Sequence, residues 1–339
     1  MTGPSPNTSL SPPLQSPMLH PPRINLAPLS GRECGLVAAY SHRVGLVGNA
    51  MAVTKGKSRR TYRLETDGGT YAIKRGSVGQ IQAEYVVIRA LAEHGFGSVP
   101  AIRAPVIEFA RQQWVAYEWV EGPSAKPEGG AALVPPAISL SLGRATAALH
   151  SAFGRVTFAP DMIPNVSKRA AQLARSLSVT EGVSPQIRPL LLDASHRVQG
   201  ALARGRFTRD RLVHGDIRFG NIVFDETGAV KAFLDFEKVA WATPFIDLAV
   251  GVRNLYSIEQ APVCSLPLDL SNALVFLDGY EPSLAEIVDR TSWRCLQEEL
   301  VLAAAYELLF VLQYPFLDPT RAVMLRAVAE AQLEWAVGL

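Results

Sequence analysis

One short run of the chain holds most of the residues that could do chemistry. Asp216 and Asn221 stand five residues apart in this run, and Asp235 follows fourteen residues later. Between the last two, Ile222–Phe224 and 230–234 are short apolar segments on either side of Asp-Glu-Thr-Gly. We expect them to pair as a hairpin, because a glycine-containing turn separates two strand-like runs. Asn221 and Asp235 would then meet at the open end of the hairpin.

These side chains suit a metal-assisted reaction at a hydroxyl group. The carboxylate of Asp235 and the amide oxygen of Asn221 are hard oxygen ligands, which magnesium prefers when it is held between a protein and phosphate groups. Asp216 would lie near the same ion, where a carboxylate can accept the proton of an attacking hydroxyl. Each residue alone would suit an ordinary turn. The joint pattern favours the chemical interpretation.

The elements that must position this run begin with a small sheet. Residues 45–74 have the alternation and the glycine turns of a three-stranded meander. The 81–94 segment has apolar residues at helical spacing and precedes Gly95, so it predicts one amphipathic helix. Residues 106–120 predict two further strands around a short polar turn. The first part of the chain is therefore expected to be a sheet with a helix.

The pattern becomes mainly helical after Glu121-Gly122-Pro123. Helices are expected over 136–151, 168–177 and 185–204 and in several segments after Pro244, interrupted by one strand pair near residue 222. These assignments predict an α+β fold with a small antiparallel sheet plus helix and a larger, mainly helical part. We divide the chain into a flexible Pro- and Ser-rich tail (1–31), an N-lobe (32–119) and a C-lobe (120–339).

The central run resembles the aminoglycoside phosphotransferase and choline kinase superfamily. The family pattern is His-Gly-Asp, four residues, Asn, then Asp-Phe or Asp-Trp, and the chain has His214-Gly215-Asp216, Asn221 and Asp235-Phe236 in this order. The resemblance implies a two-lobed, protein-kinase-like fold that uses ATP and Mg²⁺. It implies that Asp216 is the catalytic carboxylate, as in kinase catalytic loops, and that Asn221 and Asp235 bind the metal ion.

The resemblance extends to the rest of the expected nucleotide site. Lys74, in Tyr-Ala-Ile-Lys, resembles the strand lysine that holds the α- and β-phosphates, and Glu84 resembles its ion-pair partner on the next helix. Glu118 and Val120 resemble the hinge, where backbone groups contact adenine.

Two further residues belong to the expected phosphate site. Ser58 stands in the first turn, which has no Gly-x-Gly-x-x-Gly, so phosphate contact there would depend on this hydroxyl and on backbone amides. Arg218 stands two residues after the catalytic aspartate, where a guanidinium can neutralise charge on the transferred phosphoryl group. The choice between ATP and GTP stays open.

Composition restricts the class of protein further. The chain has 339 residues, of which 48% are hydrophobic, so it can build two cores. No run of roughly 18 uninterrupted apolar residues is present, so we expect no membrane partner. Three widely spaced cysteines indicate reduced thiols in a cytoplasm. The net charge of only +2 gives no reason to expect a nucleic-acid partner.

The acceptor of the reaction divides the predictions. From Glu259 to the end, the sequence has 12 acidic and four basic residues. This acidic excess would suit a cationic small molecule such as an antibiotic or an amino alcohol, and a sugar is a further alternative. A basic stretch before Asp216 could instead bind an acidic peptide and present its Ser or Thr. A non-catalytic scaffold is the third alternative. The absence of an Ala-Pro-Glu segment favours a small hydroxyl-bearing molecule over a peptide.

Overall fold

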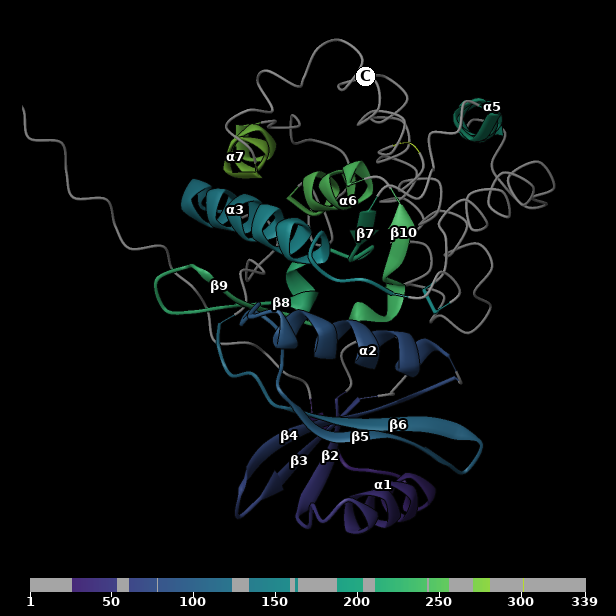
Figure 1. Ribbon diagram of the computed structural model, residues 1–339, viewed down its shortest axis with the longest axis vertical. Helices are drawn as coiled ribbons and strands as arrows, with labels where there is room; N and C mark the ends of the chain where they lie inside the picture. Colours follow the sequence, from purple (N-terminus) through teal and green to yellow (C-terminus); the bar gives the residue numbers. More distant parts are fainter. Residues whose placement is uncertain are drawn as a thin grey trace, which may run out of the picture.

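The computed structural model describes ten stretches of the chain, which form a sheet with two helices followed by a mainly helical part (Figure 1). The described residues are 26–53, 61–77, 79–123, 134–158, 162–163, 188–203, 211–242, 244–255, 271–280 and 301. Residues 1–25 of the expected tail and Ser58 lie outside them.

The first part is an antiparallel sheet of six strands in the order β1-β2-β3-β4-β6-β5. The strands are β1 Leu26–Ala27, β2 Asn49–Val53, β3 Thr61–Thr66, β4 Gly69–Gly76, β5 Ile102–Phe109 and β6 Gln112–Glu118. The expected meander is confirmed as β2 to β4, and the expected strand pair is β5 with β6. Strand β1 pairs with β2 and lies ahead of residue 32, where we expected the N-lobe to begin.

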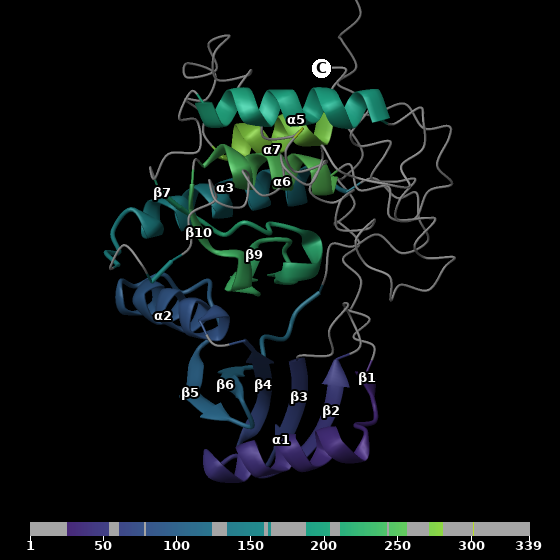
Figure 2. The same ribbon diagram turned by 90° about the vertical axis from the view of Figure 1, so that its right-hand side faces the viewer.

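The two faces of this sheet carry different helices. Helix α1, Gly31–Arg43, packs against one face, where Trp114 stacks on Tyr40 and Tyr62 with ring centroids 5.4 and 6.2 Å apart. Helix α2, Gln80–Glu93, covers the other face and lies between the sheet and the second part (Figure 2). Since side chains alternate along a strand, Lys74 of β4 faces α2, while the next residue, Arg75, faces α1.

Helix α2 joins the two parts through its buried face. Its side chains Ile81, Val87, Ile88 and Leu91 are almost fully buried. They belong to the same apolar cluster as the core of the second part, whereas the α1 face of the sheet has a separate core. The helix therefore fixes where the sheet sits relative to the second part.

The second part combines four described helices with two short strand pairs. The helices are α3 Pro136–Phe153, α5 Arg188–Ala203, α6 Phe245–Leu255 and α7 Ser271–Tyr280. The strand pairs are β8 Ile222–Phe224 with β9 Val230–Phe233, and β7 Arg211–Val213 with β10 Ala240–Ala242. Two single turns of 3-10 helix, η1 Phe219–Asn221 and η2 Phe236–Lys238, adjoin them.

The sequence predicted this part incompletely. The expected helices over 136–151 and 185–204 correspond to α3 and α5, and the expected strand pair near residue 222 is β8 with β9. The pairing of β7 with β10 was not predicted. The expected helix over 168–177 lies outside the described residues. Along the described part of the chain, no helix is both long and apolar enough to span a membrane.

Candidate active site

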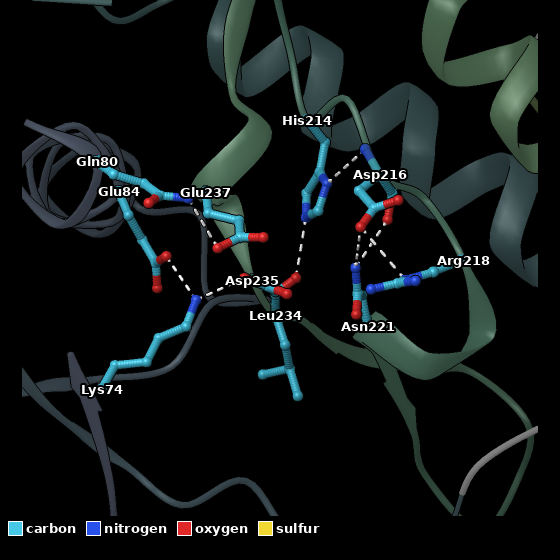
Figure 3. Close-up of polar contacts among 10 residues, drawn as sticks. All are labelled: Lys74, Gln80, Glu84, His214, Asp216, Arg218, Asn221, Leu234, Asp235 and Glu237. Carbon is cyan, nitrogen blue, oxygen red and sulfur yellow. Dashed lines mark hydrogen bonds and ion pairs between the residues drawn. The ribbon is translucent and has the colours of Figure 1, made fainter. Parts of the chain in front are cut away.

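The β8–β9 hairpin brings the predicted residues together. Ile222 pairs with Phe233, and the Leu234 N–H donates to the Asn221 carbonyl at 2.7 Å. Asn221 therefore lies opposite Leu234, the residue before Asp235, at the open end of the hairpin, as the spacing predicted. Figure 3 shows both side chains beside Asp216 and Lys74.

The carboxylate of Asp216 is buried and is held on both oxygens. Its side chain is 2% exposed. Asn221 Nδ2 donates to Oδ2 at 3.0 Å, and Arg218 Nε lies 3.2 Å from the same oxygen. Lys238 Nζ lies 3.1 Å from Oδ1. Burial acts to raise the pKa of Asp216, but the charges of Lys238 and Arg218 outweigh it and hold this pKa below its usual value. The carboxylate is ionised at neutral pH.

Lys74 connects the sheet to the metal-binding candidate. Its Nζ lies 2.6 Å from Glu84 Oε2 on α2 and 2.5 Å from Asp235 Oδ1 (Figure 3). Burial acts to lower the pKa of Lys74, but the two carboxylates outweigh it and raise this pKa, so the ammonium stays charged. Burial raises the pKa of Glu84 to about 7. Burial acts to raise the pKa of Asp235, but the positive charge of Lys74 outweighs this effect and lowers that pKa.

Asp235 occupies a backbone conformation that turns the chain sharply. Its φ of 67° lies in the left-handed region, which few residues other than glycine adopt and which Asp tolerates better than most. The residue lies two positions after the end of β9 and is the N-cap of η2, so the chain turns between these two elements. In η2, Glu237 Oε2 accepts from Gln80 Nε2 at 2.9 Å, which joins the start of α2 to this turn.

The donor atoms at the hairpin end fit a magnesium ion bound together with phosphates. Asn221 turns its amide nitrogen to Asp216, so its side-chain oxygen points away from that carboxylate (Figure 3). This oxygen and the Asp235 carboxylate are hard ligands. Among the described residues, no group of three His, Cys, Asp or Glu side chains could hold a metal ion by itself. An ion here would need oxygens from the nucleotide to complete its coordination.

A buried carboxylate on α6 holds the backbone of the 214–216 loop in place. Asp247 is fully buried and accepts the backbone N–H groups of His214 and Gly215, each at 2.7 Å. It also accepts His150 Nε2–H at 2.9 Å, while the Tyr280 hydroxyl donates to His150 Nδ1 at 2.8 Å. Helices α3, α6 and α7 are thus joined through one hydrogen-bonded chain that ends at the loop.

His214 holds the loop through both ring nitrogens. Nε2–H donates to the Leu234 carbonyl at 3.1 Å, and Nδ1 accepts the Asp216 N–H at 3.3 Å. Burial lowers the pKa of His214 despite the nearby carboxylates, so the ring is neutral. Since backbone groups of the same loop and hairpin occupy both ring nitrogens, the residue has a structural role.

The other expected residues lie at the hinge and away from this cluster. Glu118 is exposed and forms an ion pair with Arg103 at 2.8 Å, and Val120 is half-buried in the segment that leaves the sheet. Gly122 packs against the hairpin, since a Cβ there would lie 2.3 Å from the Phe224 carbonyl oxygen. Ser58 is outside the described residues, so its expected phosphate contact stays a prediction.

Sequence reasoning missed two residues that the fold brings to the site. Lys238 contacts Asp216, and Gln80 bonds Glu237. A lysine in a mixed segment looks like an ordinary surface residue. The signal that could have found it is the antiparallel pairing of β7 with β10, which sets 238 opposite 215.

Fold and site together define a protein-kinase-like phosphotransferase. Residues 49–268 match the model of the Phosphotransferase enzyme family, and the chain belongs to this family. It is a kinase. No curated protein sequence matches the chain.

Solved structures share the fold at low sequence identity. The GDP complex of wild-type aminoglycoside 2'-phosphotransferase-IIIa has a TM-score of 0.63 and 14% identity, covering 89% of this chain and 98% of that chain. An amicoumacin kinase in complex with AMP-PNP, Ca²⁺ and Ami has a TM-score of 0.61 and 15% sequence identity, and the match covers 81% of this chain and 85% of that chain. A putative aminoglycoside phosphotransferase from Ralstonia eutropha has a TM-score of 0.57 and 20% sequence identity, and the match covers 90% of this chain and 98% of that chain.

Proposed function

We propose that this kinase moves the γ-phosphoryl group of ATP to a hydroxyl of a small molecule such as an antibiotic, an amino alcohol or a sugar. The observation that carries the proposal is the buried, ionised Asp216 carboxylate beside the Lys74–Asp235 ion pair. A carboxylate that stays ionised while buried can accept a proton from an alcohol brought within hydrogen-bond distance.

The nucleotide would be held between the sheet and the hairpin. Lys74, oriented by Glu84, would bind the α- and β-phosphates, and the hinge backbone near Glu118 and Val120 would contact adenine. Asn221 and Asp235 would bind Mg²⁺, which offsets the negative charge of the phosphates.

The transfer step needs only groups that this site would bring together. The acceptor O–H gives its proton to Asp216 while its oxygen forms a bond to the γ-phosphorus. The bond between that phosphorus and the β–γ bridging oxygen breaks, and ADP leaves with the electron pair. Arg218, 46% exposed at the edge of the site, would offset charge on the moving phosphoryl group. The products are a phosphate monoester, ADP and a protonated Asp216.

Two observations support a small acceptor. The amicoumacin kinase that shares the fold is in complex with AMP-PNP, Ca²⁺ and Ami, and a spectinomycin phosphotransferase with a TM-score of 0.55 and 12% identity is in complex with ADP and spectinomycin. In the basic stretch that could attract an acidic peptide, Arg197 pairs with Asp193 of the same helix at 2.8 Å, which reduces the charge it offers to a partner.

Replacing the proposed proton acceptor tests the function. Asp216→Asn keeps the shape of the side chain but removes its charge, so we expect kcat to fall roughly 100-fold or more while MgATP affinity stays close to wild type. Turnover would be followed as ADP release with a panel of aminoglycosides, small alcohols and Ser/Thr peptides, and affinity by calorimetry. Asp193→Asn on α5 is the matched control and should change neither.

The panel also decides the acceptor class. Wild-type turnover with a small hydroxyl compound, lost in Asp216→Asn, would support the proposal. Phosphate incorporation into a peptide instead would move the function to a peptide kinase. Full turnover by Asp216→Asn with any acceptor would show that this carboxylate is not the base.

A further inference from the structure

Lys238 reaches the proposed proton acceptor from the side opposite to Arg218 and Asn221. Its Nζ lies 3.1 Å from Asp216 Oδ1, whereas the other two residues contact Oδ2. The Lys238 side chain is 28% exposed, and that of Asp216 is 2% exposed. The ammonium therefore sits where a buried carboxylate oxygen borders the open side of the site.

Resting on the proposed role of Asp216, we propose that Lys238 is a positioning residue that orients Oδ1 of this carboxylate towards the acceptor hydroxyl. A carboxylate offers about four lone-pair sites. Asn221 and Arg218 occupy the two on Oδ2, and Lys238 occupies one on Oδ1. Within the described part of the chain the remaining site is on Oδ1, so a hydroxyl that gives its proton to Asp216 would dock beside the Lys238 ammonium.

The backbone delivers Lys238 to this place. Strands β7 and β10 pair with Val213 opposite Ala240. Continuing this antiparallel register by two residues sets Gly215 opposite Lys238. The contact is tight, since a Cβ on Gly215 would lie 2.5 Å from the Lys238 carbonyl oxygen. Lys238 thus fixes the catalytic loop by its backbone and the catalytic carboxylate by its side chain.

Lys238 is one of two cations at Asp216, and it is the one that contacts Oδ1. Arg218 already provides one positive charge to the carboxylate. With Lys238 removed, only Oδ2 would keep its partners, and the group could rotate about its Cβ–Cγ bond. A misplaced base loses proton-transfer efficiency because catalysis depends on the geometry of the bound reactants. Removing Lys238 should therefore lower kcat and leave nucleotide binding intact.

The test is Lys238→Met, which keeps an unbranched chain and removes the ammonium. We expect kcat with the best acceptor to fall roughly 10- to 100-fold while KM for MgATP stays close to wild type. Arg89→Met is the matched control, because Arg89 is an exposed cation on α2 paired with Glu93, and it should keep wild-type kcat.

A chemical rescue separates orientation from a merely structural effect. Lys238→Cys, with kcat lowered as in Lys238→Met, should regain most of its kcat when 2-bromoethylamine converts the thiol to a lysine analogue, and should not when iodoacetamide adds a neutral group. Wild type treated in the same way controls for the exposed Cys34 and the other two cysteines.

The results distinguish this inference from the proposed function. Loss of kcat in Lys238→Met with rescue by aminoethylation supports the inference. Wild-type kcat in Lys238→Met, with Asp216→Asn inactive, overturns the role of Lys238 and leaves the proposed function standing. A rise in KM for MgATP without change in kcat, or a loss that aminoethylation does not restore, also overturns it. Full activity of Asp216→Asn would remove the basis of both.

Discussion

At the scale of single residues, opposite charges keep the buried side chains of Lys74, Asp216 and Asp235 ionised. Lys74 lies between two carboxylates, and Asp216 lies between two cations. Asp247 accepts the two backbone N–H groups of the loop and the His150 Nε2–H, so hydrogen bonds stabilise this buried side chain. These arrangements reduce the cost of burying charge and leave the reactive groups in fixed orientations.

The neutral ring of His214 predicts a pH dependence of stability. Its pKa in the folded protein is below the ordinary value of 6.5, so the unfolded chain binds more protons there as the pH falls below about 6.5. The free energy of unfolding should therefore decrease with falling pH, by up to about 1.4 kcal/mol per pH unit from this group. Urea unfolding at several pH values between 8 and 5 measures the slope.

His214→Gln isolates this contribution. Glu84, whose pKa burial raises to about 7, contributes with the opposite sign over an overlapping range, because its folded form binds more protons than its unfolded form. The decisive quantity is therefore the difference in slope between wild type and variant, and wild type should lose more stability towards pH 5. Equal slopes in wild type and His214→Gln would contradict the neutral ring.

At the scale of elements, two short strand pairs position the site, and the sequence predicted one of them. The β8–β9 hairpin has apolar strands around a turn closed at Gly228, a local pattern that a sequence displays. The β7–β10 pair consists of two three-residue strands far apart in the chain. Such strands are too short to show a period of two, and their pairing depends on the folded hairpin between them. Lys238 was missed for this reason.

The same pairing makes Gly215 a sensitive position. Its φ is +78°, and Gly95 at the end of α2 has the same φ with no atom near a Cβ. Gly95→Ala should cost about 1–2 kcal/mol of unfolding free energy for the left-handed backbone alone. Gly215→Ala adds the contact with the Lys238 carbonyl, so it should cost about 1–3 kcal/mol more. Urea unfolding of both variants gives the difference.

The contact between a side chain at position 215 and the Lys238 carbonyl should also affect activity. Gly215→Ala should lower kcat because the loop and Lys238 must move apart, whereas Gly95→Ala should leave kcat unchanged. Equal stability and equal kcat in the two variants would mean that the close approach of η2 to the catalytic loop has no energetic consequence.

At the scale of the whole molecule, the site lies where two parts share a core. The buried face of α2 joins the cluster of the second part, and Lys74–Asp235 and Gln80–Glu237 cross between the parts at its polar edge. The sequence predicted two lobes from the break at Glu121-Gly122-Pro123 and the mainly helical pattern that follows it. It did not reveal which face of α2 is shared, because a helix with apolar residues on one side does not identify its partner.

A ligand bound at this junction should stabilise both parts together. We predict that MgATP at about 100 times its dissociation constant raises the unfolding free energy by about 2.7 kcal/mol, because it binds the folded chain only. Asp235→Asn should lose most of this increase, since the amide keeps the side-chain shape but lacks the charge expected to hold the metal. EDTA with wild type should have the same effect. Thermal unfolding with and without MgATP measures it.

Amide hydrogen exchange shows which elements of the whole molecule MgATP protects. Binding at the junction should slow amide exchange in β4, which carries Lys74, and in the β8–β9 hairpin, which precedes Asp235, because both sides would contact the nucleotide and its metal ion. In Asp235→Asn the protection of the hairpin should be lost first, since it depends on the metal ion. Protection confined to β4 in the wild type, or an unchanged response in Asp235→Asn, would place the metal ion away from the hairpin.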